Sequence, residues 1–300
     1  MDKRISNALQ ESYIRRYTLT DGKETGLKVI ELNNGTLRVL LNESKALDIM
    51  QVWHKGVNMS FVSKNGFTAR EIPFLKRFEG GMVYSCGLDS IGGREGYELH
   101  GSLHNTPASV KSVVQEAGKL EVTANVECTS LFGENLLLNR KITLEGGKLL
   151  LEDTLMNKGA KPADYCLLYH INVGYPMLDE GVEIIADVES VTPRNEYSKQ
   201  FLQNRTVFEM PQENVDERCY FLKNKSNWIS AQNRKLGKKM TITYSNDTLP
   251  ALVQWNSPVS QDYALGLEPA TSYLDDSFEY RHLLPEQQVE FSVALSFADI

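Results

Sequence analysis

The sequence has little cysteine, no long hydrophobic run and no concentration of positive charge. Its four cysteines are widely spaced in 300 residues and form no CxxC pair, which excludes a disulfide scaffold and favours buried free thiols. Nowhere do about 18 apolar residues follow one another, so no membrane-spanning helix is predicted. The 32 Lys and Arg against 39 Asp and Glu give a net charge of -7. Because these cations form no basic stripe, nucleic acid is not an expected partner.

The first 18 residues also lack the apolar core of a secretory signal, because six of them are charged. The chain is therefore expected to be cytoplasmic and to have no membrane partner. In the same segment Ile5, Leu9, Tyr13 and Tyr17 recur every four residues, a spacing that allows a short helix.

Most of the remaining chain is typical of short strands separated by turn residues. Asn33-Asn34-Gly35 and Glu145-Gly146-Gly147 are such turns, at hairpin distances. No amphipathic helix of roughly 10 to 15 residues lies between the strands, which excludes βαβ and TIM-barrel folds. No repeat, linker or charge shift marks a boundary. We predict a single domain over residues 1–300, a large antiparallel β-sandwich with few short helices. The expected strands are 27–32, 37–41, 47–53, 58–62, 120–128, 136–144, 148–156, 164–171, 239–244, 252–255, 263–267 and 288–297.

Histidine is scarce, with five residues, and two of them lie four apart in a polar segment. The spacing of His100 and His104 would suit zinc on a helix. However, Gly101, Asn105 and Pro107 favour a loop, and Gly101 stands where an HExxH site has its glutamate. No metal is predicted.

Two further segments place a polar side chain next to an apolar strand. His170 follows an apolar run that breaks at Gly174 and Pro176, which predicts a histidine at a strand end facing a cleft, with a structural histidine as the alternative. Glu268 ends another apolar run just before Pro269. Burial there would raise the pKa of its carboxyl group, whereas at an exposed edge it would be an ordinary surface residue.

Other catalytic motifs are absent: the chain has no GxSxG, no GxxxxGK[ST] and no GxGxxG after a strand. A pair of carboxylates for glycoside hydrolysis stays open, because spacing in sequence does not fix their separation in space. Glu268 would be one of them, with Glu98 or Asp89 as the second.

In their order along the chain, these segments resemble the aldose 1-epimerase (galactose mutarotase-like) family, and within it a little-characterised branch. Each motif is short, but their number and order cover nearly the whole chain. They are Ala46-Leu47-Asp48-Ile49, Arg77-Phe78-Glu79-Gly80-Gly81, Ser85-Cys86-Gly87-Leu88, Leu99-His100-Gly101, Pro107-Ala108, His170-Ile171-Asn172-Val173-Gly174, Leu249-Pro250, Gln254-Trp255, Leu267-Glu268-Pro269-Ala270-Thr271 and Leu284-Pro285-Glu286.

The resemblance implies a β-supersandwich with a sugar cleft across one sheet, and an isomerase that interconverts the α and β anomers of an aldose. Glu268 matches the general base that takes the proton of the anomeric hydroxyl, and His170 matches the general acid that protonates the ring oxygen. His100 matches a second histidine beside the ring oxygen, and Arg77 a substrate-binding arginine. No cofactor or metal is required, and the partner is a small-molecule sugar.

Other residues of the implied site match less directly. The aspartate that holds the distal hydroxyls in this family has no clear counterpart, and Asn172, Gln254 or Asp153 would replace it. His104 either reaches the substrate or braces its loop, and Trp255 either stacks on the sugar or packs in the core. The identity of the sugar, any phosphate or sulfonate on it, and the oligomeric state, a homodimer included, stay open.

The chemistry of ring opening requires two groups of opposite role, because a carboxylate cannot fully ionise an anomeric hydroxyl beforehand. With a histidine pKa of about 6.5, His170 would be protonated while Glu268 is ionised, each contributing roughly 100- to 10,000-fold. The rate profile should then be bell-shaped, bounded by a carboxylate below and a histidine above. Two alternatives are a non-catalytic carbohydrate-binding or sugar-sensing protein on the same fold, and a glycosidase.

Overall fold

The structure is a computed structural model that describes residues 3–116 and 118–300, and strands dominate it. The only α-helices among these residues are single turns, α1 (Phe74–Arg77) and α2 (Glu196–Gln200), with four 3-10 turns at Ala8–Gln10, Gly22–Glu24, Leu103–Asn105 and Leu202–Asn204. The strands are β1 (Tyr13–Thr18), β2 (Lys28–Asn33), β3 (Leu37–Asn42), β4 (Asp48–His54), β5 (Val57–Asn58), β6 (Val83–Leu88), β7 (Ala108–Glu116), β8 (Lys119–Thr129), β9 (Asn135–Glu145), β10 (Lys148–Asn157), β11 (Ala163–Val173), β12 (Glu183–Pro193), β13 (Arg218–Asn233), β14 (Lys238–Tyr244), β15 (Ala251–Val259), β16 (Asp262–Ala270), β17 (Arg281–Leu283) and β18 (Gln288–Asp299).

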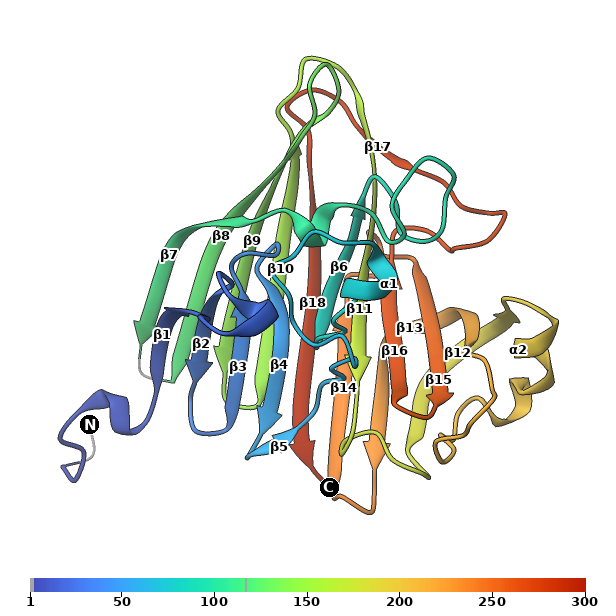
Figure 1. Cartoon of the computed structure of the whole chain (residues 1–300), viewed down its shortest axis with the longest axis horizontal. Coiled ribbons are helices and arrows are strands. Elements are labelled where there is room, and N and C mark those ends of the chain that lie inside the picture. The colour runs from blue at the N-terminus through green and yellow to red at the C-terminus, as the bar shows by residue number, and fades with distance from the viewer. Residues whose placement is uncertain (1–2, 117) are drawn as a thin grey trace.

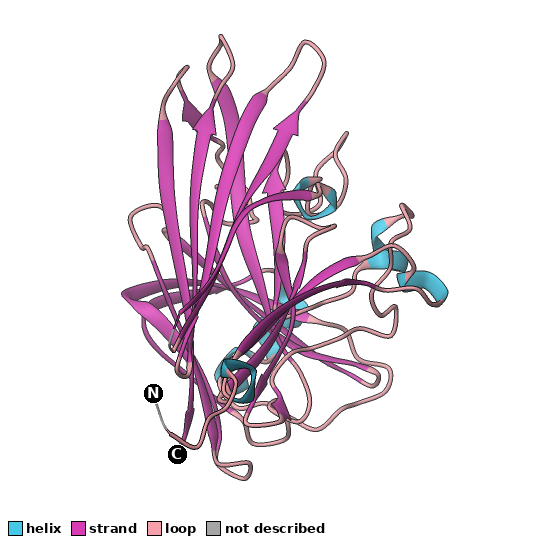
Figure 2. Ribbon diagram, turned by 90° about the vertical axis from the view of Figure 1, so that its left-hand side faces the viewer, coloured by secondary structure: helices cyan, strands magenta, loops and turns pink. Residues whose placement is uncertain are grey.

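These strands form one antiparallel sheet that folds over on itself (Figures 1 and 2). Hydrogen bonding runs through β7-β8-β9-β10-β18-β14-β13-β15-β16-β11-β6-β4-β3-β2-β1, with β12, β5 and β17 attached to β13, β4 and β11. The two ends nearly meet, because the Gln115 side chain at the end of β7 donates to the Ser12 carbonyl before β1 at 3.0 Å. The expected all-β sandwich with few helices is confirmed.

Folding the sheet over buries its alternating apolar positions between the two layers. Leu32 and Val39 from the β2-β3 hairpin share one core cluster with Val122 and Ile142 from the β8-β9 hairpin. A second, smaller cluster lies on the other side of the sheet, around Tyr84 on β6, where α1 and a later loop cover the strands. This second side is where the polar residues of interest converge.

The strand predictions are close to the observed bounds for β2–β4, β8–β11, β14 and β18, and they cover only part of β15 and β16. The strand expected over 58–62 is wrong, because β5 ends at Asn58. The helix considered near the N-terminus is wrong, because Tyr13–Thr18 is strand β1, held by its antiparallel ladder to β2. All four cysteines are free, and three of them are buried. Among the described residues no helix has the length and apolarity needed to cross a membrane.

Candidate active site

Strand register brings His170 and Glu268 together at the centre of the sheet. His170 on β11 lies opposite Tyr84 on β6, and two residues later Asn172 lies opposite Gly266 on β16. That register puts Glu268 across from His170, at the distance of a cross-strand side-chain pair. Neither residue terminates its strand: β11 continues to Val173 and β16 runs on through proline to Ala270. The expectation of two strand ends is therefore corrected to two mid-sheet positions.

The two side chains face each other directly. His170 Nε2 lies 3.3 Å from Glu268 Oε1, and both side chains are buried. Glycine at position 266 makes room for this arrangement, because a Cβ there would lie 2.2 Å from Glu268 Oε1 and 3.0 Å from the Cβ of Trp255. The pair can therefore hold one proton between a carboxyl group and an imidazole.

The surroundings decide where that proton resides. Burial raises the pKa of Glu268 well above its usual value, and the negative charge of Glu217 adds to this effect. Burial, together with the charge interaction with the nearby His100, lowers the pKa of His170 to about 3. Both shifts favour a neutral glutamic acid beside a neutral imidazole, whereas reference pKa values predict an ion pair.

His100 reaches the same place from a loop whose backbone is tightly constrained. Its φ is +66° and that of Gly101 is +76°, a region that favours glycine. A Cβ at Gly101 would lie 2.4 Å from the Ser90 carbonyl oxygen. The His100 ring is 5.5 Å from the His170 ring and packs 5.1 Å from Phe74. Burial lowers the pKa of His100 to about 4, so its imidazole is neutral too.

A cavity of about 620 Å³ contains all three of these polar side chains. Its floor is the sheet, from which His170, Glu268, Val253, Trp255 and Cys219 project. Its cover consists of α1 and two loops, and Figure 1 shows α1 in front of β6 and β11. The cover is mostly apolar, and its side chains are Phe74, Leu75, Phe78, Leu99 and Leu274.

The rim of the cavity is formed by two ion pairs and an indole. Arg194 Nη2 lies 2.7 Å from Glu217 Oε1, and the Trp255 indole donates to Glu217 Oε2 at 2.6 Å. On another part of the lining, Lys64 pairs with Asp262 at 2.7 Å. Sequence reasoning found Trp255 but missed the four charged residues, because they come from separate segments and match no local motif.

Four residues predicted to bind substrate do not line this cavity. Arg77 is buried and pairs with Glu98 at 2.5 Å. Asn172 donates to the backbone carbonyls of Gly81 and His170. Gln254 points to the opposite face of β15 from Trp255, and there it hydrogen-bonds to Arg205. These three side chains lie outside the cavity lining. The fourth, His104, belongs to a separate buried network.

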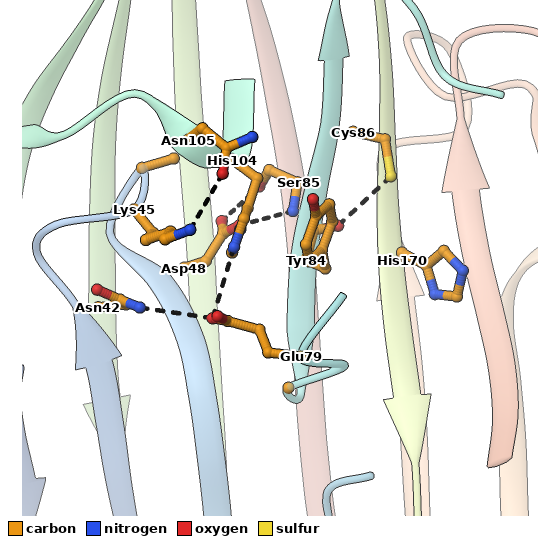
Figure 3. Close-up of polar contacts among 12 residues, drawn as sticks. Asn42, Lys45, Asp48, Glu79, Tyr84, Ser85, Cys86, His104, Asn105 and His170 are labelled. Atoms are coloured by element: carbon orange, nitrogen blue, oxygen red, sulfur yellow. Dashed lines mark hydrogen bonds and ion pairs between the residues drawn. The ribbon is translucent and has the colours of Figure 1, made fainter. Parts of the chain in front are cut away.

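In that network His104 lies between two carboxylates and stacks on Tyr84, as Figure 3 shows. Its Nδ1 is 2.7 Å from Asp48 Oδ2 and its Nε2 is 3.5 Å from Glu79 Oε1. Burial acts to lower the pKa of His104, but the hydrogen bonds to Asp48 and Glu79 raise it overall. Tyr84 lies between this network and His170 (Figure 3).

Beyond Asp48 the network continues to Arg140, which is fully buried. Arg140 bonds to Asp48 at 2.6 Å, and to Asp153 through two nitrogens at 2.9 and 2.7 Å. Asp153 also accepts from the Tyr169 hydroxyl at 2.8 Å. Asp153 is therefore committed to the core and does not replace the missing aspartate. In the described part of the chain no group of three or more His, Cys, Asp or Glu is placed to hold a metal.

The fold of the chain is similar to that of solved structures named as aldose 1-epimerase or galactose mutarotase-like proteins. A candidate aldose 1-epimerase from Klebsiella pneumoniae is 23% identical over 95% of this chain and 83% of its own, with a TM-score of 0.85. A galactose mutarotase-like protein from Clostridium acetobutylicum is 15% identical over 97% of this chain and 100% of its own, with a TM-score of 0.72. Another galactose mutarotase-like protein, from Lactobacillus casei, is 14% identical over 90% of this chain and 100% of its own, with a TM-score of 0.63.

Residues 24–282 match the model of a domain of unknown function, DUF4432, and the chain belongs to that family. No curated protein matches the sequence. The resemblance drawn from the short motifs is thus confirmed at the level of the fold, in a branch that carries its own family model.

Proposed function

We propose that this protein is an aldose 1-epimerase that interconverts the α and β anomers of a sugar. The observation that carries the proposal is the buried contact between His170 and Glu268, in a cavity that also contains the imidazole of His100. A purely structural site gains nothing from a carboxyl group whose pKa burial raises, and such perturbed pairs are concentrated at catalytic sites.

The reaction needs one proton delivered to the ring oxygen and one removed from the anomeric hydroxyl. The bond between C1 and the ring oxygen then breaks, and the hydroxyl oxygen becomes the aldehyde oxygen. Rotation about the C1–C2 bond presents the other carbonyl face, and reclosure with reversed proton transfers gives the other anomer. His170 and Glu268 carry out the two transfers, with His100 beside the ring oxygen and Trp255 along one side of the sugar.

Because the pair holds a single proton, two assignments of general acid and general base to His170 and Glu268 are kinetically equivalent. Either Glu268 takes the hydroxyl proton while a protonated His170 donates, or Glu268 donates from its neutral acid while neutral His170 accepts. Both have the same total protonation, so they give the same pH dependence. The low pKa of His170 and the raised pKa of Glu268 favour the second assignment in the free site.

The test is anomer exchange measured by NMR on a panel of aldoses, with wild type, Glu268→Gln and His170→Asn. Wild type should accelerate exchange, and each variant should lower the rate by roughly 100-fold or more, with unchanged circular dichroism. Wild-type exchange rates in both variants would refute the assignment. Saturable sugar binding without any accelerated exchange would instead support a carbohydrate-binding protein.

A glycosidase remains the second catalytic candidate, favoured by one observation. Glu217, rather than Glu98 or Asp89, is the second glutamate in the cavity lining with Glu268. Its engagement by Arg194 and Trp255 favours a positioning role over that of a nucleophile. Release of nitrophenol from nitrophenyl glycosides would support the glycosidase. A cytoplasmic location, a homodimer and single-domain organisation over residues 1–300 stay predictions from the sequence.

A further inference from the structure

The hydrogen-bonding capacity of the cavity is concentrated at one place. His100 Nδ1, His170 Nδ1 and Glu268 Oε1 are buried and make no hydrogen bond; Glu268 Oε1 has only the 3.3 Å contact with His170. All three atoms belong to side chains that line the cavity. A sugar bound beside these side chains would have them as partners for its anomeric hydroxyl, its ring oxygen and a neighbouring hydroxyl.

Several other polar groups of the lining already have protein partners. The Ser63 hydroxyl and the Asn65 amide both donate to the Phe78 carbonyl, at 2.5 and 3.0 Å. The Gly92 carbonyl accepts from the Ser90 hydroxyl at 2.8 Å and from the His100 amide. The Lys64–Asp262 and Arg194–Glu217 pairs stand at the partly exposed rim.

The cover over the sugar is therefore a surface without hydrogen-bonding side chains. Phe74 and Phe78 pack against each other at 5.1 Å and reach the rings of His100 and His170. The side chain of Leu274 continues this surface past Gly92. A hydroxyl pressed against such a surface loses its water and gains no partner, which costs more than burying a methyl group or a methylene.

We infer that the substrate is a deoxy aldose, in which a methyl or methylene group facing the cover replaces one hydroxyl of an ordinary hexose. This inference rests on the proposed function, because it assigns the substrate class of the same site. The polar end of the cavity takes the anomeric carbon and its neighbours, and the apolar cover takes the deoxygenated carbon.

Matched sugars that differ by one hydroxyl test the inference. The pairs are D-galactose and D-fucose, L-galactose and L-fucose, D-glucose and 6-deoxy-D-glucose, and L-mannose and L-rhamnose. Anomer exchange NMR gives kcat/KM for each sugar. In at least one pair, the one whose stereochemistry fits the floor, the deoxy sugar should be faster by at least about tenfold.

A cover variant makes the test specific to this surface. Leu274→Asn offers a partner to a hydroxyl and should reduce the preference within that pair by about threefold or more, whereas Leu274→Met should keep it. The readout is the ratio of kcat/KM for two sugars measured on the same protein sample. A partial loss of folded protein changes both values equally and leaves the ratio unchanged. A fully hydroxylated sugar that exchanges as fast as its deoxy partner in every pair overturns the inference and leaves the epimerase standing. Accelerated exchange of no sugar overturns both.

Discussion

The carboxyl group of Glu268 folds back over Gly266, two residues earlier on the same face of β16. The space that glycine leaves is filled by Glu268 Oε1, so closely that a Cβ at position 266 would lie 2.2 Å from it. The Trp255 side chain closes the other side of that space. The position of the acid is therefore fixed by the absence of a side chain at a neighbouring strand position, and not only by its contact with His170.

Replacing Gly266 by alanine should displace the carboxyl group and lower the exchange rate by roughly 100-fold, since a shift of about 1 Å in a reacting group has that effect. Gly92→Ala is the matched control. It lines the same cavity, but its added Cβ would meet only Leu274, at an ordinary contact distance of 3.5 Å. Exchange NMR on both variants checks this, and equal rates in Gly266→Ala and wild type would contradict it.

The pH dependence of the exchange rate should be bell-shaped with an unusually broad plateau. The acid limb reports protonation of the pair at the low pKa of His170, about 3, and the alkaline limb reports loss of the last proton at the raised pKa of Glu268. The two apparent values belong to the pair as a unit. Rates measured between pH 3 and 10 test the prediction, and an acid limb near pH 4.5 with an alkaline limb near 6.5 would show unperturbed groups and contradict it.

Much of this site follows from the sequence, because a short motif marks each of its central residues. Glu268, His170 and Trp255 come from apolar runs that predict strands, although their positions within the strands do not follow from the sequence. The rim pair of Arg194 and Glu217 does not follow. Arg194 directly follows β12 and Glu217 directly precedes β13. Only the antiparallel pairing of these two strands brings the two residues together.

Arg77 and His104 show the opposite limit. The resemblance implied that Arg77 binds the substrate, and for His104 it left open a substrate contact or a loop-bracing role. A short motif predicts a polar residue near a site. It does not predict whether that residue lies in the cavity or in the buried network beside it. Tyr84 separates those clusters here, and its neighbour across the strands is His170. The sequence predicts a raised pKa for Glu268 if the residue is buried, but not the lowered pKa of His170. That shift depends on burial under the α1 cover, which no local pattern predicts.

Glu268 should reduce stability at alkaline pH, as buried carboxyl groups with a raised pKa do. Below the unfolded pKa of about 4.5 the Glu268 carboxyl is protonated in both the folded and the unfolded protein, so it does not change the free energy of unfolding. As pH rises above that value the unfolded state ionises first, so the folded state loses stability until its own raised pKa is passed. Glu268→Gln removes this loss, and thermal unfolding at pH 4 and pH 8 should show a gain in Tm only at pH 8. Glu213→Gln, at an exposed position, is the control, and a gain of the same size in it would contradict the assignment.

The buried pair of His104 and Asp48 should also lose stability as pH rises, but from a stabilisation that is present at low pH. The pKa of His104 is raised, so the stabilisation is complete below the unfolded pKa of about 6.5 and declines as pH rises through the folded value. His104→Asn leaves the buried Asp48 short of a partner and should cost roughly 3 kcal/mol at pH 6 and less at pH 10.

Urea unfolding of His104→Asn at the two pH values measures this difference. His282→Asn is the matched control, because His282 also pairs with an aspartate, Asp164, but both side chains are more than half exposed; its cost should stay within about 1 kcal/mol. The same variants separate the two polar clusters in function. Since His104 lies behind Tyr84 and outside the cavity lining, KM for the sugar should be unchanged wherever the variant is folded. A raised KM with unchanged stability would place His104 at the substrate after all.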